Sequence, residues 1–114
     1  MYIIIKEENG FMPDTIIEIY DNKIQIEENN KKKVLNYDRE QIKKIMTFVL
    51  EISHNWQSKY IGKSIIDEDV YIIAIYGDTK GTIIKECYIK NKYPNNWSNF
   101  ISFRNKLVRE ELKL

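Results

Sequence analysis

The sequence predicts an α+β domain of two layers, in which an antiparallel sheet carries both of its helices on one face. Short runs rich in β-branched residues, separated by turn residues, predict the strands. Two stretches with apolar residues at helical spacing predict the helices. Each helix follows a hairpin pattern, so we expect two hairpin-plus-helix units in series.

The first half begins with strand patterns that are broken by Asn, Gly and Pro. Residues 12–14, Met-Pro-Asp, read as a connector. Asn29-Asn30 reads as a tight turn, because Asn tolerates positive φ. The lysines of the last strand suit an exposed sheet edge. The predicted strands are 2–6, 15–20, 23–28 and 31–37.

The first helix has a clear start signal. Asp38 is placed to cap it, and Gln41 is placed to complete a capping box, with Tyr37 and Ile42 as the hydrophobic staple. Apolar residues then recur at helical spacing on one face. The helix is expected to end near residues 54–55.

The second half follows a similar plan. Residues 58–66 are either a short strand or an ordered loop, and residues 67–69 are a solvated break. Asn96 is placed to cap a helix that runs from about Trp97 to near the C-terminus. The predicted strands are 70–76 and 82–90, joined by a hairpin loop at 77–81.

A faint repeat relates the two halves of this single predicted domain, residues 1–114. "IIEIYDN" (16–22) resembles "IIAIYGD" (72–78), and the same offset relates Tyr37 to Tyr93. Convergent patterning is the alternative to a true duplication, since strands and helix starts draw on few patterns. The boundaries of the pseudo-repeat would be about 14–55 and 70–112.

The alignment of the halves assigns the faces of the strands. An unpaired buried carboxylate is costly, so Glu18 should face away from the helices. Ile17 and Ile19 then point to the core, and by correspondence so do Ile73 and Ile75.

The opposite sheet face is apolar and rich in tyrosine, which indicates an interface. The alternative is that the N-terminal strand or segment 58–66 covers this face. The residues predicted to bind a partner there are Ile16, Glu18, Tyr20, Val70, Ile72 and Tyr76, with Ala74 beside them.

The composition limits the classes of function. The chain has 114 residues, of which 18 are basic and 17 acidic, for a net charge of +1. This balance argues against nucleic acid as the main partner. The longest apolar run is too short to span a membrane. The chain has one cysteine and no signal-peptide pattern, so a cytoplasmic location is expected.

The sequence offers little catalytic chemistry. His54 lies near the end of the first predicted helix, where it can interact with the helix dipole, and Cys87 lies in mid-strand. The acidic cluster Asp67–Asp69 lacks the spacing of a calcium loop, and one Cys and one His make no zinc site. No metal or other cofactor is expected. Lys31–Lys33 read as a solubilising edge.

The second half resembles small α+β domains of uncharacterised Firmicute proteins. The likeness covers about residues 56–108 and consists of Trp56, the acidic loop, the apolar hairpin and "YPNNWSNF" (93–100). As a single compact domain the chain is similar to immunity proteins and phage-encoded inhibitors, which act by binding. The resemblance implies no catalytic residue.

Together these features predict a non-enzymatic protein-binding module, a bacterial or phage inhibitor or immunity-type protein that masks a partner surface. A homodimer is another use of the same face. The first alternative is a small-molecule binder with a pocket between sheet and helices, its mouth lined by Trp56 and Trp97. The second is an enzyme that uses His54 or Cys87.

Overall fold

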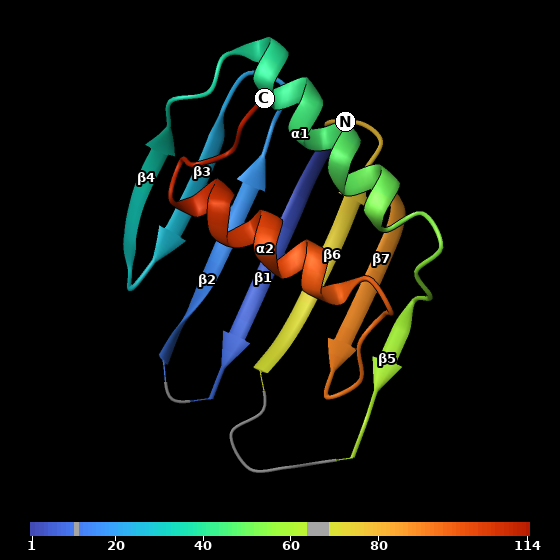
Figure 1. Ribbon diagram of the computed structural model, residues 1–114. Coiled ribbons are helices and arrows are strands. Elements are labelled where there is room, and N and C mark those ends of the chain that lie inside the picture. Colours follow the sequence, from blue (N-terminus) through green and yellow to red (C-terminus); the bar gives the residue numbers. More distant parts are fainter. Residues whose placement is uncertain (11, 64–68) are drawn as a thin grey trace.

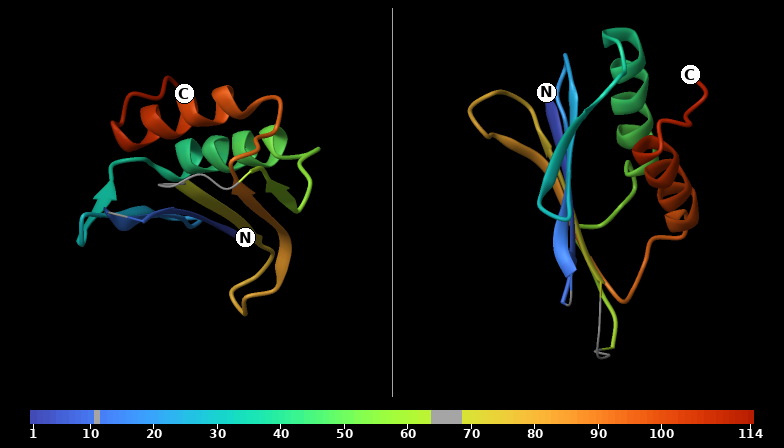
Figure 2. Two further views of the ribbon diagram at one scale, coloured as in Figure 1. Left: turned by 90° about the horizontal axis from the view of Figure 1, so that it is seen from below. Right: turned by 90° about the vertical axis from the view of Figure 1, so that its left-hand side faces the viewer.

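A computed structural model describes residues 1–10, 12–63 and 69–114. They form a seven-stranded sheet with two helices on one of its faces, so the fold is α+β (Figures 1 and 2). In chain order the elements are β1 (Tyr2–Asn9), β2 (Met12–Ile19), β3 (Ile24–Glu28), β4 (Lys31–Leu35), α1 (Arg39–Ile52), β5 (Lys59–Ile61), β6 (Asp69–Tyr76), β7 (Ile83–Lys90) and α2 (Trp97–Val108).

The strand order in the sheet is β4-β3-β2-β1-β6-β7-β5. Neighbouring strands are antiparallel except β5 and β7, which are parallel. The prediction of a purely antiparallel sheet is therefore wrong at one edge, because the ambiguous segment 58–66 supplies β5. Residues 64–66 of that segment lie outside the described residues.

The N-terminal strand occupies the centre of the sheet. β1 pairs with β2 on one side and with β6 on the other. The hairpins β2–β3 and β6–β7 extend outward from β1 in opposite directions (Figure 1). The two halves that resemble each other in sequence are thus the two flanks of one continuous sheet.

The connector predicted at 12–14 is wrong, because these residues begin β2. Asn9 of β1 pairs with Met12, after a shift of register. The pairing of β2 with β3 begins only at Ile16. Pro13 thus lies beyond the end of β3, where the strand is paired on one side only, and a sheet accepts proline in that setting.

The core lies between the sheet and the helices and is dominated by isoleucine. Ile17, Ile19, Ile73 and Ile75 are all buried there, which confirms the predicted strand faces. Burial of such side chains is the main stabilising contribution to a fold. Other core residues include Ile3, Ile5, Ile24, Ile26, Ile42, Ile45, Val49, Phe100 and Leu107.

The start of α1 confirms the predicted capping box. The Asp38 carboxylate accepts a hydrogen bond from the Gln41 backbone N–H, and the Gln41 side chain accepts one from the Asp38 N–H, both at 2.9 Å. At the other end, the Lys85 ammonium from β7 donates to the carbonyls of Ser53 and His54. A cation there also offsets the negative end of the helix dipole.

Asn96 does not have its predicted role. It stands at the N-cap position of α2, but its side chain makes no capping hydrogen bond. Instead the Asn96 amide accepts from the Trp56 indole N–H at 2.7 Å and donates to the Ile52 carbonyl at 2.8 Å. The Asn96 side chain therefore connects the start of α2 to the end of α1 by hydrogen bonds.

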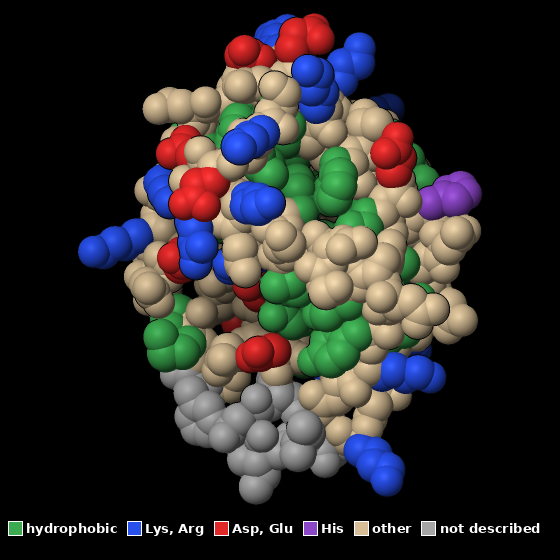
Figure 3. Space-filling view, viewed as in Figure 1, with side chains coloured by type: hydrophobic (Ala, Val, Ile, Leu, Met, Phe, Trp, Pro, Cys, Tyr) green, Lys and Arg blue, Asp and Glu red, His purple; other side chains and the backbone are tan. Residues whose placement is uncertain are grey.

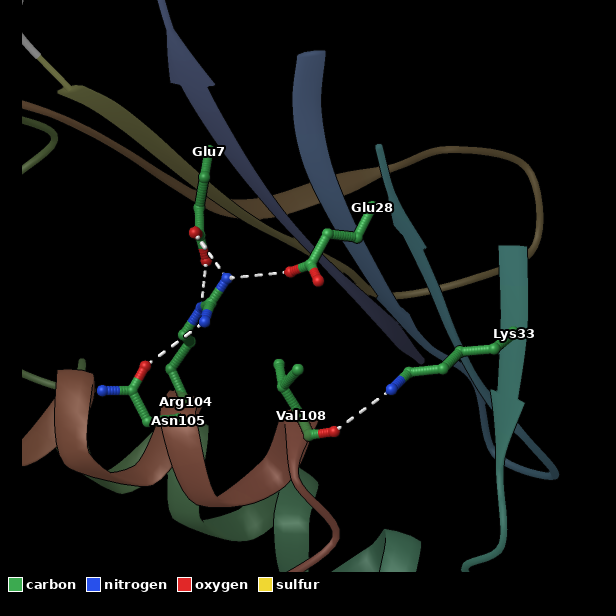
Figure 4. A network of polar contacts seen from close by, with 6 residues as sticks. All are labelled: Glu7, Glu28, Lys33, Arg104, Asn105 and Val108. Atoms are coloured by element: carbon green, nitrogen blue, oxygen red, sulfur yellow. Dashed lines mark hydrogen bonds and ion pairs between the residues drawn. The ribbon is translucent and has the colours of Figure 1, made fainter. Parts of the chain in front are cut away.

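Arg104 of α2 ties the helix layer to the sheet (Figure 4). Its guanidinium donates two hydrogen bonds to the Glu7 carboxylate of β1, at 2.6 and 2.8 Å. The Glu28 carboxylate of β3 lies 3.9 Å away, and the Asn105 side chain accepts a further bond at 3.2 Å. Bidentate pairs of this kind fix geometry as well as adding energy.

Candidate functional site

The structure places all six predicted partner-binding residues on the sheet face that points away from the helices. Three of them lie on β2 or directly after it, and three lie on β6. Each side chain is half-buried and so keeps part of its contact with solvent. The six are Ile16, Glu18, Tyr20, Val70, Ile72 and Tyr76.

Strand β1 contributes further residues to this surface, beyond the six that were predicted from the sequence. In register, Lys6 lies between Ile16 and Ile72, and Ile4 lies between Glu18 and Ala74. The predicted residues of β2 and β6 are thus bridged by β1. Alternation along the first strand was the available signal, but it did not show that this strand enters the middle of the sheet.

Three tyrosines cluster at one end of the same face. The rings of Tyr2 and Tyr76 are nearly parallel, at 8°, with centroids 4.5 Å apart. Tyr20 packs beside Tyr2 at 5.6 Å. Its hydroxyl donates a hydrogen bond to the Glu18 carboxylate, and the Lys23 ammonium lies 5.5 Å from the centre of its ring. Tyrosines arranged in this way offer a large apolar area with polar tips.

The β6–β7 hairpin extends the surface. The register slips after Ile75, so that Tyr76 lies opposite Ile83 and Ile84 is the extra residue of a bulge. Ile83 is 50% exposed and Ile84 is 60% exposed, although both are aliphatic. Bulges bend the strand that carries them. The end of this hairpin projects on the side away from the helices (Figure 2).

Gly77 leaves room for the bulge. A Cβ at this position would meet the Ile84 side chain at 2.9 Å.

Tyr88 of β7, opposite Ile72, extends the apolar area further. We call the whole surface the open sheet face, and its apolar and tyrosine residues are Tyr2, Ile4, Ile16, Tyr20, Val70, Ile72, Tyr76, Ile83, Ile84 and Tyr88.

No described segment lies across the open sheet face. The N-terminal strand, which was considered as a cover, is part of the sheet itself. Residues 59–61 of the other candidate cover form an edge strand beside β7. Both helices lie on the opposite side of the sheet (Figure 2). The face is thus accessible as far as residues 1–10, 12–63 and 69–114 are concerned.

The hydrogen bond to Glu18 changes the acidity of Tyr20. Together with burial it raises the pKa of Tyr20 to about 12. The pKa of Tyr71 is also raised to about 12, chiefly by burial and next by Glu7. An unfolded tyrosine titrates at about 10. Both groups therefore favour the native state below about pH 10, and their contribution is lost as the pH rises from about 10 to about 12.

We expect Glu18→Gln to lower the pKa of Tyr20 toward its ordinary value, because the substitution removes the charged acceptor. The pKa of Tyr71 should not change, since burial is its main cause. The measurement is a pH titration of the tyrosine ring carbons by NMR, with Tyr71 as the internal control. A wild-type Tyr20 that already titrates near the ordinary value would contradict the hydrogen bond.

The residues considered for other chemistry differ in their surroundings. Cys87 is buried on the helix side of β7, where burial raises the pKa of its thiol. His54 is exposed just beyond α1. Of the predicted acidic loop, residues 67–68 lie outside the described residues and Asp69 begins β6. In the described residues, no three or more His, Cys, Asp or Glu side chains are grouped to hold a metal ion.

The lysine-rich strand lies at the sheet edge, as predicted. β4 is the last strand on its side, and its first two lysines, Lys31 and Lys32, stand opposite Glu28 and Glu27 of β3. The Lys33 ammonium lies 3.4 Å from the carbonyl of the last residue of α2. Two of the three lysines of this strand thus stand opposite acidic residues of β3.

The two tryptophans belong to an aromatic cluster between the helices and the sheet. Trp97 stacks on Phe100 and on Tyr93, and Tyr71 meets it edge-on. Trp56 is largely buried beside them and borders a cavity of about 300 Å³ at the end of α1. The predicted pocket mouth is thus mainly a packed cluster, with a small hollow next to it.

Comparison with known proteins finds no family model, no curated protein and no solved structure that matches this chain. In the described residues, neither helix has the length and apolar character that crossing a membrane requires.

Proposed function

We propose that this chain is a non-enzymatic protein-binding module and that the open sheet face is its docking surface. The observation that carries the proposal is the number of apolar and tyrosine side chains on that face, where charged residues such as Lys6 and Glu18 lie among them. An antiparallel sheet that has one face in water is normally polar on that face. Here, a cluster of three tyrosines and two exposed isoleucines lie together instead. Such a surface is typical of an interface.

The residue types on this face suit protein recognition. Tyrosine is enriched among the residues that dominate binding energy. Its ring buries a large area while its hydroxyl stays available for hydrogen bonds. Glu18 orients the Tyr20 hydroxyl. Rigid aromatic groups also lose little conformational freedom on binding. The clustered rings are therefore suited to be the centre of the contact.

In its specific form, the proposal is an inhibitor or immunity-type protein of a bacterium or phage that acts in the cytoplasm by masking a surface of its partner. Two features support this form of the proposal: the size of the domain and the resemblance of its second half to such proteins. The burial of Cys87 also favours a binding role over an enzymatic one, because a reactive thiol is normally accessible and has a lowered pKa.

We expect the double variant Tyr20→Ser, Tyr76→Ser to lose the binding partner of the wild-type chain. The partner is captured from a lysate of the source organism, and sedimentation measures self-association in parallel. Tyr93→Ser is the matched control, because Tyr93 is an exposed tyrosine that stacks on Trp97 at the start of α2. Circular dichroism checks that each variant remains folded.

Several outcomes separate the alternatives. Equal capture and equal sedimentation by the wild type and the folded double variant would refute the docking surface. A wild-type dimer that the double variant loses would identify the partner as a second copy of the chain. A stoichiometric small adduct in the native mass spectrum would instead favour the small-molecule binder, with the cavity beside Trp56 as its site.

A further inference from the structure

A groove runs between α1 and α2 on the outer side of the helix layer, opposite to the open sheet face, and residues 112–114 also line it. The groove has a volume of about 630 Å³. Its floor includes Phe48 and Phe103, and its rim includes Lys44, Lys106 and Lys113. Figure 3 shows hydrophobic side chains gathered between the two helices, with Lys and Arg side chains beside them.

The floor of the groove combines the core residue Phe103 with Phe48, which is not part of the buried core. Phe48 lies outside the core-facing stripe of α1 and is 38% exposed, although its ring packs at a tilt against that of Phe103 with centroids 4.5 Å apart. A Phe in this position leaves apolar area in contact with water. Removing that area from water is favourable, so the ring can serve as an anchor point for a partner.

The rim of the groove has a positive charge balance. Of the described side chains that line it, three are lysines and one, Glu51, is acidic. None of the three lysines forms an ion pair with a side chain in the described part of the chain. This local excess contrasts with the net charge of +1 of the whole chain. An acidic partner would be attracted and oriented by it.

The openness of the groove favours a helix of a partner protein over a small ligand. α2 contributes the short polar side chains Asn99 and Ser102, which leave space beside Phe103. Lys44, Phe48, Ser102 and most other lining residues are exposed, so the groove is open to solvent. A small ligand is normally enclosed over most of its surface, whereas an amphipathic helix lies in an open groove.

We propose that this groove binds an acidic amphipathic helix of a partner protein. Apolar side chains at helical spacing pack on Phe48 and Phe103, and flanking Asp and Glu side chains face Lys44, Lys106 and Lys113. The bound helix lies on the outer side of the helix layer. This site is on the other side of the molecule from the open sheet face and does not depend on it.

The test is a selection on the full-length chain. A displayed library carries a helix of about 18 residues, or about five turns, with fixed leucines at helical spacing and randomised flanking positions. We expect the selected sequences to be enriched in Asp and Glu at the flanks. Their affinity, measured with synthetic peptides, should fall about tenfold or more for Lys44→Glu, Lys106→Glu, which corresponds to about 1.4 kcal/mol.

The matched control is Lys59→Glu, Lys80→Glu, which makes the same charge change on β5 and in the β6–β7 loop. Both of these lysines are exposed and neither lines the groove. The control should bind the selected peptides as tightly as the wild type. Phe48→Ser is a second test of the floor, and circular dichroism confirms that each variant is folded.

Three results would overturn the proposal. The first is a selection without acidic enrichment, or without any binder. The second is equal peptide affinity for the wild type and for the groove variant. The third comes from dodecanoate, a small anionic amphiphile used as a probe. If dodecanoate shifts the NMR signals of Phe48 while no selected helix depends on the groove, the site takes small ligands instead.

Discussion

Replacing Arg104 by Ala is expected to lower the free energy of unfolding by about 2 kcal/mol, within the range for losing hydrogen bonds to a charged group, because the pair with Glu7 is part-buried. The side chains of Arg104 and Glu7 are only 17% and 16% exposed. Without the guanidinium, the Glu7 carboxylate would remain beneath the helix layer with its charge no longer compensated by α2. Urea unfolding followed by circular dichroism measures the loss.

Lys6→Ala is the matched control, because Lys6 lies on the same strand but on the open sheet face. Its ion pairs with Glu8 and Asp14 are longer, at 3.5 and 3.7 Å, and its side chain is 39% exposed. Exposed pairs contribute about 0–1 kcal/mol. Equal losses for Lys6→Ala and Arg104→Ala would contradict the larger contribution of the part-buried pair.

A double variant separates the pair from the packing around it. Glu7→Met, Arg104→Met keeps apolar contact at both positions and leaves neither charge of the pair behind. We therefore expect it to be more stable than Arg104→Ala, since apolar replacements of buried ion pairs are often neutral. The native pair would then act mainly to set the position of α2 over the sheet.

The parts of this fold that depend on short stretches of chain could be predicted from the sequence. The capping box at Asp38 and Gln41 is set by residues three positions apart, and it forms as expected. The turn at Asn29-Asn30 also forms, and both residues have positive φ, at 53° and 63°. The place of Glu18 in β2 correctly assigned the core-facing isoleucines of that strand, because side chains alternate between faces along a strand. The correspondence of the two halves then correctly assigned Ile73 and Ile75 of β6.

The parts that depend on pairing between distant strands could not be predicted. Nothing in the first strand pattern distinguishes a central strand from a cover over the sheet, because both bury alternate residues. The order of the strands decides this, and contacts between segments far apart in the chain set that order. For the same reason Tyr2 was missed, although its ring completes the tyrosine cluster.

Side-chain hydrogen bonds between residues far apart in the sequence could not be predicted either. Asn96 has the residue type and position of a helix cap, yet it bonds to Trp56 and Ile52. Local propensity is a weak guide when a buried donor elsewhere needs a partner, since leaving it unsatisfied costs about 1–3 kcal/mol. The indole N–H of Trp56 is such a donor.

Phe100→Ala is expected to lower the free energy of unfolding by about 3–5 kcal/mol, the range for removing a buried Phe from a core. Phe100 is fully buried. Its ring lies 5.4 Å from that of Trp56 and 5.1 Å from that of Trp97, so it joins the end of α1 to the start of α2. The cavity left behind would loosen both helices, which chemical denaturation would detect.

Phe48→Ala is the counterpart of this variant, because both positions are helix phenylalanines that contact Phe103. Phe48 is already 38% exposed, so its truncation should cost about 1 kcal/mol. A cost as large as that of Phe100→Ala would mean that Phe48 is a core residue. A small cost together with loss of the selected helical peptides would mean that Phe48 contributes to binding more than to folding, as the groove between α1 and α2 requires.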